Sequence, residues 1–234
     1  MHWEDNSKRE NEFIVPDDVV DVSFKLICKQ LPTTHAWELA QALYRALPWL
    51  EDEPEVGIHQ IHGATSGNGW ERPPDGELIH LSRRSRMRIR VPKQRIDATQ
   101  SLTGKTLDIA GHALEVGEST IKPLQPLATL FARYVIVPYG QDEDGFLDTV
   151  AGELLQRGIR ARKMLCGIGH TVSTPEQDFE TRSMMIADLD KQTSIDLQET
   201  GIGPGRHLGC GIFLPHKGIK AVGETEDKVH FTGT

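Results

Sequence analysis

The sequence predicts an α+β fold made of two tandem βαββαβ units. Strand-like and helix-like patterns follow one another in this order twice along the chain. A chain of 234 residues is long enough for two units of about 100 residues each. We expect a mobile N-terminal segment at 1–17, one domain at 18–125, a second domain at 126–222 and a tail at 223–234.

The first unit begins with a strand over 18–31, where apolar and polar residues alternate. A helix follows, with Thr34 as its N-cap, apolar residues at helical spacing up to Leu47, and Pro48 as its end. Residues 56–62 predict a second strand, and 63–75 a long turn-rich loop. A strand or bent strand pair over 77–91, a short helix over 93–102 and a closing strand or hairpin over 107–121 complete the unit.

The second unit repeats this order after a junction near 123–126. An apolar strand is predicted over 131–138, and a helix over 144–157. A hairpin over 162–171 and 178–189, a short helix over 194–200 and a last strand over 212–216 follow. This order is that of the ferredoxin-like, or RRM-like, fold. The inward face of the 144–157 helix is predicted to carry Phe146, Leu147, Val150, Leu154 and Leu155.

Composition excludes several classes of protein. The polar N-terminus and the lack of an 18-residue apolar run predict neither a secretory signal nor a membrane span. The 3 cysteines stand far apart without metal-type pairing, as expected for reduced thiols in a cytoplasmic protein. A net charge of −8 argues against a generic polyanion binder, so any basic surface must be local.

One basic stripe stands out between residues 83 and 95, where no acidic residue occurs. Alternating arginines on a strand lie about 6.5–7 Å apart on one face, a spacing that suits successive phosphates. We predict RNA contacts here, with a solvated strand face as the alternative. In the preceding loop, Trp70 either stacks on an unpaired base or packs structurally. The predicted arginine contacts are Arg83, Arg84, Arg86, Arg88 and Arg90.

A glycine-rich segment, GIGPGRHLGCG at 201–211, leads directly into the last predicted strand. Glycines let the backbone approach another chain closely and aim N–H groups at it. The spacing and the following strand do not fit a dinucleotide-binding fingerprint. An ordinary flexible loop is the alternative to an RNA-gripping one. The predicted RNA contacts are Gly203, Gly205, Arg206, His207 and Gly209, together with Lys217 after the last strand.

This segment resembles the GhGxxxxxGhG loop of CRISPR-associated RAMP-superfamily proteins, where h is hydrophobic. The chain is also similar to the sixth Cas family, the repeat-cleaving endoribonucleases, and most of all to its Myxan-subtype variant. The segments that carry this narrower resemblance are THAWELAQALYRALPWL, GIHQIHGATSGNGW, LSRRSRMRIRVP, LFARYV and GCGIFLPHKGI.

The resemblance implies metal-independent cleavage of CRISPR repeat RNA, with no cofactor, leaving a 2′,3′-cyclic phosphate and a 5′-hydroxyl. It further implies that the enzyme stays on the mature guide RNA beside other Cas effector-complex subunits, in a defence or transposon system. A catalytic histidine at or near the first helix is implied, and His35 matches that position. A helix N-terminus keeps such an imidazole neutral, as a base requires. His62, at a predicted strand end, is the second catalytic candidate.

Two other functions remain open at this point. A non-catalytic RAMP subunit that holds one end of a guide RNA would share the fold and the glycine loop without needing His35. A metal hydrolase would use His59, His62 and a carboxylate. Three residues of separation along a strand point these two histidines to opposite faces, which disfavours a shared metal.

Overall fold

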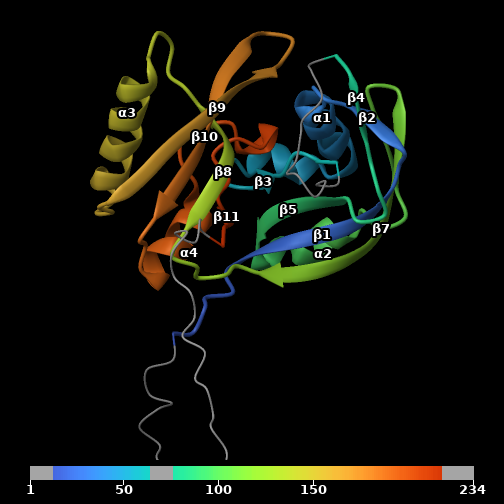
Figure 1. Cartoon of the computed structure of the whole chain (residues 1–234). Helices are drawn as coiled ribbons and strands as arrows, with labels where there is room; N and C mark the ends of the chain where they lie inside the picture. The colour runs from blue at the N-terminus through green and yellow to red at the C-terminus, as the bar shows by residue number, and fades with distance from the viewer. Residues whose placement is uncertain (1–12, 64–75, 218–234) are drawn as a thin grey trace, which may run out of the picture.

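The computed structural model describes residues 13–63 and 76–217. It has a mixed α+β fold with antiparallel sheets, as predicted (Figure 1). A five-stranded sheet has the order β3-β5-β1-β7-β6, a four-stranded sheet the order β11-β8-β10-β9, and β2 pairs with β4. Within these described ranges, no helix has the length and apolar character needed to cross a membrane.

The five-stranded sheet is built around β1, which pairs antiparallel with β5 and with β7. Its helix α1 (Ala36–Ala46) is followed by the 3-10 turn η2 (Pro48–Asp52), and η3 (Lys93–Arg95) leads into α2 (Ile96–Gln100). The strands are β1 (Val19–Ile27), β3 (Gly57–Ile58), β5 (Arg86–Pro92), β6 (Thr106–Ile109) and β7 (His112–Pro123), with β2 (Gln30–Pro32) and β4 (Leu78–His80) as a separate pair.

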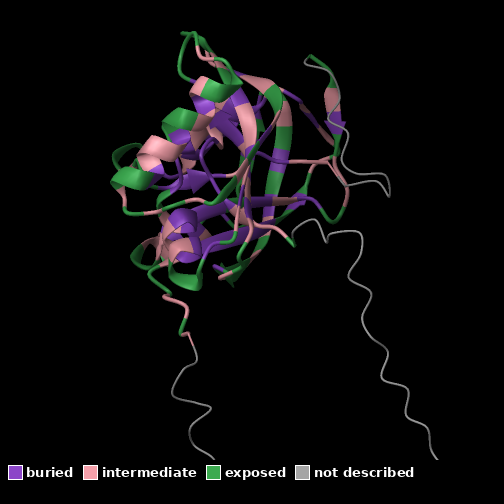
Figure 2. Cartoon of the chain, turned by 60° about the vertical axis from the view of Figure 1, so that its left-hand side comes forward, coloured by how far each residue is buried: buried purple, intermediate pink, exposed green. Residues whose placement is uncertain are grey.

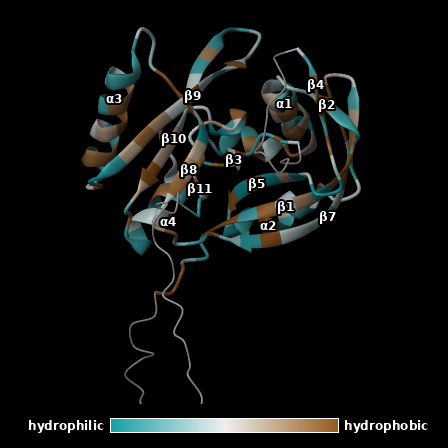
Figure 3. Cartoon of the chain, viewed as in Figure 1, coloured by the Kyte–Doolittle hydropathy of each residue, from teal (hydrophilic) through white to brown (hydrophobic). Residues whose placement is uncertain are grey.

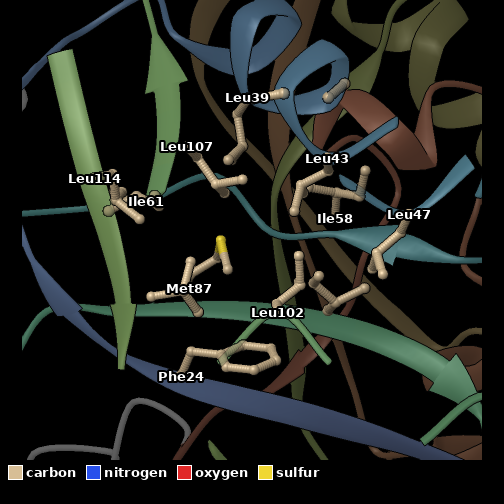
Figure 4. Packing of buried hydrophobic residues seen from close by; sticks show 14 of the residues in the cluster. Phe24, Leu39, Leu43, Leu47, Ile58, Ile61, Met87, Leu102, Leu107 and Leu114 are labelled. Atoms are coloured by element: carbon tan, nitrogen blue, oxygen red, sulfur yellow. The ribbon is translucent and has the colours of Figure 1, made fainter. Parts of the chain in front are cut away.

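The core of this half lies between the sheet and α1. Leu39 and Leu43 recur at helical spacing on α1 and face Phe24 of β1 and Met87 of β5 (Figure 4). All four side chains are buried. Truncating Phe24 to alanine would cost about 3–5 kcal/mol of stability, since the space it fills would become a cavity.

The four-stranded sheet is centred on β8 (Leu130–Ile136) and β10 (Asp178–Ala187), with β9 (Lys163–Ser173) and β11 (Leu214–Pro215) at its edges. The side chain of Asp142 caps α3 (Glu143–Gln156) by accepting from the Gly145 amide, and Asp190 caps α4 (Lys191–Thr200) in the same way. Figure 3 shows hydrophobic and hydrophilic residues mixed along these strands, and Figure 2 shows α3 exposed on its outer side.

The structure departs from the predicted elements at several points. The predicted 18–31 strand ends at Ile27, because the chain leaves β1 to form β2 against β4. His35 rather than Thr34 occupies the N-cap of α1, without a side-chain cap hydrogen bond. Leu155 is 58% exposed, so the inward face of α3 is narrower than predicted. The predicted strands over 56–62 and 212–216 shorten to two residues each.

Candidate functional site

A cleft of about 360 Å³ lies where the two halves of the chain meet. Arg84, Arg86 and Arg88 line it from the first half, and Arg133 of β8 lines it from the second. None of the described residues that line the cleft is acidic. Such a concentration of guanidinium groups suits a phosphate-bearing ligand, although the chain as a whole carries a net charge of −8.

Three of the five predicted arginine contacts therefore share this cleft. Arg88 on β5 and Arg84 before it are exposed, while Arg86 is half-buried. Arg86 Nη1 donates to the carbonyls of Arg83 and Ser85, each at 2.8 Å, which fixes the direction of its guanidinium. Arg83 is exposed but does not line the cleft.

The prediction that Arg90 contacts RNA is wrong, because its side chain is buried. Its side chain is 1% exposed, and its Nε and Nη2 donate to the Asp21 carboxylate at 2.7 and 3.0 Å. Its Nη1 donates to the carbonyls of Gln198 and Phe213, both at 2.8 Å. Strand alternation places Arg90 on the same face as Arg88, but the second half covers this end of β5. Arg90 thus joins the two halves.

The carboxylate beside Arg90 belongs to Asp21 of β1. Burial by itself would raise the pKa of Asp21, but the Arg90 guanidinium and the adjacent His59 hold that pKa well below its usual range. Asp21 is therefore a permanent negative charge in the interior, and Arg90 is the cation that compensates it.

The tip of the glycine segment also faces the protein instead of a ligand. Arg206 is 6% exposed and donates through Nε to the Glu55 carbonyl at 2.8 Å and through Nη2 to the Glu199 carbonyl at 2.9 Å. Burial lowers the pKa of Arg206 to about 10. The prediction that Arg206 contacts RNA is wrong, since Nε and Nη2 bind backbone carbonyls on both halves.

His207 is likewise engaged within the protein. Its Nε2 donates to the Glu53 carbonyl at 3.0 Å, so Nδ1 accepts from the Tyr44 hydroxyl at 2.6 Å. Burial lowers the pKa of His207, which favours the neutral ring that this arrangement requires. In place of the predicted RNA contact, His207 links the glycine segment to α1 through Tyr44.

The glycines of this segment permit a close approach, as predicted, but the approaching chain is the protein's own. Gly209 has φ of +81°, and a Cβ there would lie 2.8 Å from Cγ of Gln60. A Cβ at Gly205 would lie 2.9 Å from Cδ1 of Ile136. The exposed Gly203 amide donates to Glu153 at 3.2 Å. Of the three predicted glycines, Gly209 lines the cleft, whereas Gly203 and Gly205 do not.

His35 does not have the environment of a general base. Its ring is 1% exposed, Nε2 accepts from the Ile61 amide at 3.0 Å, and Nδ1 lies 2.7 Å from the Pro32 carbonyl. Because an amide can only donate and a carbonyl can only accept, the proton sits on Nδ1 and both nitrogens serve the backbone. This overturns the expectation that His35 takes a proton from substrate. His35 instead fixes the segment before His62 against the start of α1.

His59 and His62 lie in the same cleft. The prediction that they face opposite sides is wrong, because β3 ends at Ile58 and strand alternation no longer applies beyond it. His62 is half-buried, with its ring centroid 6.1 Å from that of Tyr134 on β8. His59 Nε2 lies 3.5 Å from Asp21 Oδ1. Sequence reasoning missed Tyr134 and Arg133, although both belong to the LFARYV segment.

The remaining predicted residues lie apart from the cleft or beyond the described ranges. Lys217 is exposed after β11 and does not line the cleft. Trp70, most of the 1–17 segment and the 223–234 tail fall outside the described residues. Within 13–63 and 76–217, no group of three or more histidine, cysteine, aspartate or glutamate residues is placed to hold a metal ion.

Comparisons with known proteins agree with the resemblance seen in the sequence. A family model described as Cas6 Crispr matches residues 20–218. The CRISPR-associated endonuclease Cas6 of Myxococcus xanthus (strain DK1622) is 30% identical over 196 residues, which cover 84% of this chain and 81% of the relative.

Solved structures give the same fold at much lower identity. "CRISPR associated protein Cas6" superposes with a TM-score of 0.59 at 12% identity and covers 85% of this chain and 100% of that one. "An RAMP protein binding different RNA substrates" superposes with a TM-score of 0.58 at 13% identity, covering 83% and 98%. The sequence matches, which span most of both chains, establish that this chain belongs to the Cas6 family.

Proposed function

We propose that this protein is an endoribonuclease that cleaves CRISPR repeat RNA without a metal ion. We further propose that it remains on the mature guide RNA as a subunit of an effector complex. The observation that carries the proposal is the cleft lined by four arginines and two histidines and by no described acidic residue. Its Myxococcus xanthus relative is a CRISPR-associated endonuclease.

Each half is proposed to be a ferredoxin-like domain, with boundaries at 18–125 and 126–222. The four strands of the βαββαβ pattern can be numbered 1 to 4 within each half, with β2, β4 and β6 left out of the count. The first sheet then contains the order 2-3-1-4 (β3-β5-β1-β7), and the second sheet has the order 4-1-3-2 (β11-β8-β10-β9). These two orders are the same arrangement read from opposite edges. The order supports the domain assignment, and each half has its own hydrophobic core.

The arginines supply the electrostatic part of the proposed reaction. Attack of a ribose 2′-oxygen on the adjacent phosphorus builds negative charge on a pentacoordinate phosphorane. Arg84 and Arg88 reach the cleft from one side and Arg133 from the other, so a phosphate between the two halves would meet cations on both sides. Each guanidinium can donate two parallel hydrogen bonds to phosphate oxygens.

His62 is the residue we propose for proton transfer, in place of His35. It is half-buried beside the Tyr134 ring, which restricts its orientation, and it lines the cleft together with the arginines. In the proposed step the 2′-hydroxyl loses its proton, the O2′–P bond forms and the P–O5′ bond breaks. The departing O5′ takes up a proton, which leaves a 2′,3′-cyclic phosphate and a 5′-hydroxyl.

The test is cleavage of a repeat-containing RNA in EDTA by the native chain and by His62→Ala. His112→Ala is the matched control, because His112 starts β7 and does not line the cleft. We expect chelator-resistant cutting that His62→Ala slows by about 100-fold or more and His112→Ala leaves unchanged. Binding is measured on RNA with a 2′-deoxyribose at the scissile position, which cannot be cut.

Retention is tested by asking whether native protein and cleaved RNA elute together in gel filtration. Tight binding without cutting would replace the proposal by the guide-holding, non-catalytic subunit. Cutting that stops in EDTA and returns with a divalent metal would contradict the metal-free mechanism.

A further inference from the structure

A second histidine, His59, shares the cleft with His62 and lies beside a buried carboxylate. Its Nε2 is 3.5 Å from Asp21 Oδ1, and its side chain is 11% exposed. Nε2 makes no hydrogen bond of ordinary geometry among the described residues, and the Asp21 carboxylate is its ion-pair partner. A histidine placed to fill the core would normally satisfy both ring nitrogens, as His35 does.

Asp21 is rigidly placed to act on this ring. Its two carboxylate oxygens accept from Nε and Nη2 of Arg90, whose Nη1 is held by carbonyls of the second half. The carboxylate therefore cannot turn away from His59 without breaking both of its hydrogen bonds to Arg90. A carboxylate beside an imidazole nitrogen orients the ring and favours one tautomer, with the proton toward the carboxylate.

The charges around His59 favour its neutral form. Burial lowers the pKa of His59, and the positive charges of Arg90 and Arg88 lower it further. The Asp21 carboxylate raises this pKa, but the net result lies below the ordinary value for histidine. The groups that face His59 are Asp21 of β1 and Arg88 and Arg90 of β5, and the cleft adds Arg84, Arg86, Arg133 and His62. A ring that is neutral at pH 7 can accept a proton at its unprotonated nitrogen, as a general base requires.

We propose that His59 is the general base of the RNA cleavage reaction, with Asp21 as its positioning residue and His62 as the general acid. With the proton on Nε2 directed toward Asp21, Nδ1 of His59 takes the 2′-hydroxyl proton as the O2′–P bond forms, and protonated His62 gives its proton to O5′ as the P–O5′ bond breaks. One proton is taken and one is given, so no further reactant is needed. This inference rests on the proposed function and assigns the two proton transfers within it.

The experiment measures single-turnover cleavage between pH 5 and 9 for the native chain, His59→Ala, His59→Gln, His62→Ala and His112→Ala. The native rate should fall at low pH, where the base is protonated, and at high pH, where the acid is deprotonated. We expect His59→Ala to cut about 100-fold or more slowly, to lose the low-pH fall and to regain activity with added imidazole. His62→Ala should lose the high-pH fall instead.

Two further measurements separate chemistry from structure. His59→Gln should bind the 2′-deoxy RNA within about threefold of the native chain, and its urea midpoint should stay close to the native one. A native rate in both His59 variants would overturn the inference while leaving the proposed function intact. If the His59 variants lose RNA binding and stability along with cleavage, and keep the native pH profile, then His59 is a structural residue. A native chain that does not cut would remove the proposed function and this inference together.

Discussion

Replacing Arg90 by methionine separates the two roles that arginines play on a single strand. Arg88 and Arg90 lie two residues apart on β5 and point to the same side, yet Arg88 is exposed and Arg90 is buried between the halves. Methionine keeps most of the length and apolar area of the arginine stem but removes its charge and its donors. The change therefore tests the buried ion pair with little loss of packing.

The expected magnitude follows from what Arg90→Met leaves behind. The Asp21 carboxylate would stay buried without the cation that donates two hydrogen bonds to it, and the carbonyls of Gln198 and Phe213 would each lose a donor. Removing one member of a buried pair costs about 3–5 kcal/mol. With a urea m-value of about 3 kcal/mol/M, the unfolding midpoint should fall by about 1–1.7 M.

The matched control is Arg88→Met, which removes an exposed arginine from the same strand. Its stability should stay within about 0.5 kcal/mol of the native value, because the residue is exposed. Its affinity for repeat RNA should instead fall, and its dependence on salt should weaken by about one counterion. Equal urea midpoints for the two variants would refute the buried-pair reasoning, as would a loss of RNA affinity in Arg90→Met without any loss of stability.

Two other changes probe the join between the halves. Gly209→Ala should destabilise the protein by about 2–4 kcal/mol in urea unfolding, because the new Cβ adds backbone strain at a positive φ and clashes with Gln60. Gly203→Ala should cost only about 1–2 kcal/mol, because Gly203 has a φ of +67° but its Cβ would meet open space. Because the pKa of His207 is lowered in the folded state, its contribution to stability is present above pH 6.5 and is lost as the pH falls through the folded pKa. The urea midpoint should therefore drop between pH 7 and pH 5, and His207→Phe should reduce that drop without abolishing it, because the pKa of His59 is also lowered.

Local patterns in the sequence were sufficient to predict most of the elements. The alternation in β1 and the helical spacing in α1 specify a core that forms within one stretch of chain, and Asp142 and Asp190 mark helix starts by short-range capping. The family resemblance likewise came from contiguous segments. These features depend on residues close together in sequence, so a single sequence is enough to predict them.

Contacts between the halves could not be predicted in the same way. The glycine segment indicates that some chain approaches closely, but nothing local says whether that chain is RNA or the segment around Gln60. The strand pattern puts Arg88 and Arg90 on one face, yet only the position of the second half decides which of them is covered. The segment that follows β3 carries His59 and His62 into one cleft, and it is held at Ile61 by a hydrogen bond to His35, a contact that crosses the first half.

The residues predicted to bind RNA and found buried explain why the cleft has its shape. Arg90 holds the second half against one end of β5, and Arg206 holds the glycine segment to the Glu55 carbonyl of the first half. Between these two joins, Gly209 lets the glycine segment lie directly against Gln60 at the wall of the cleft. A bulkier residue at 209 would push the halves apart and move Arg133 away from Arg88. The cationic pair proposed to hold a phosphate from both sides thus depends on buried arginines and glycines outside that pair, so their substitution should reduce cleavage through the geometry of the cleft.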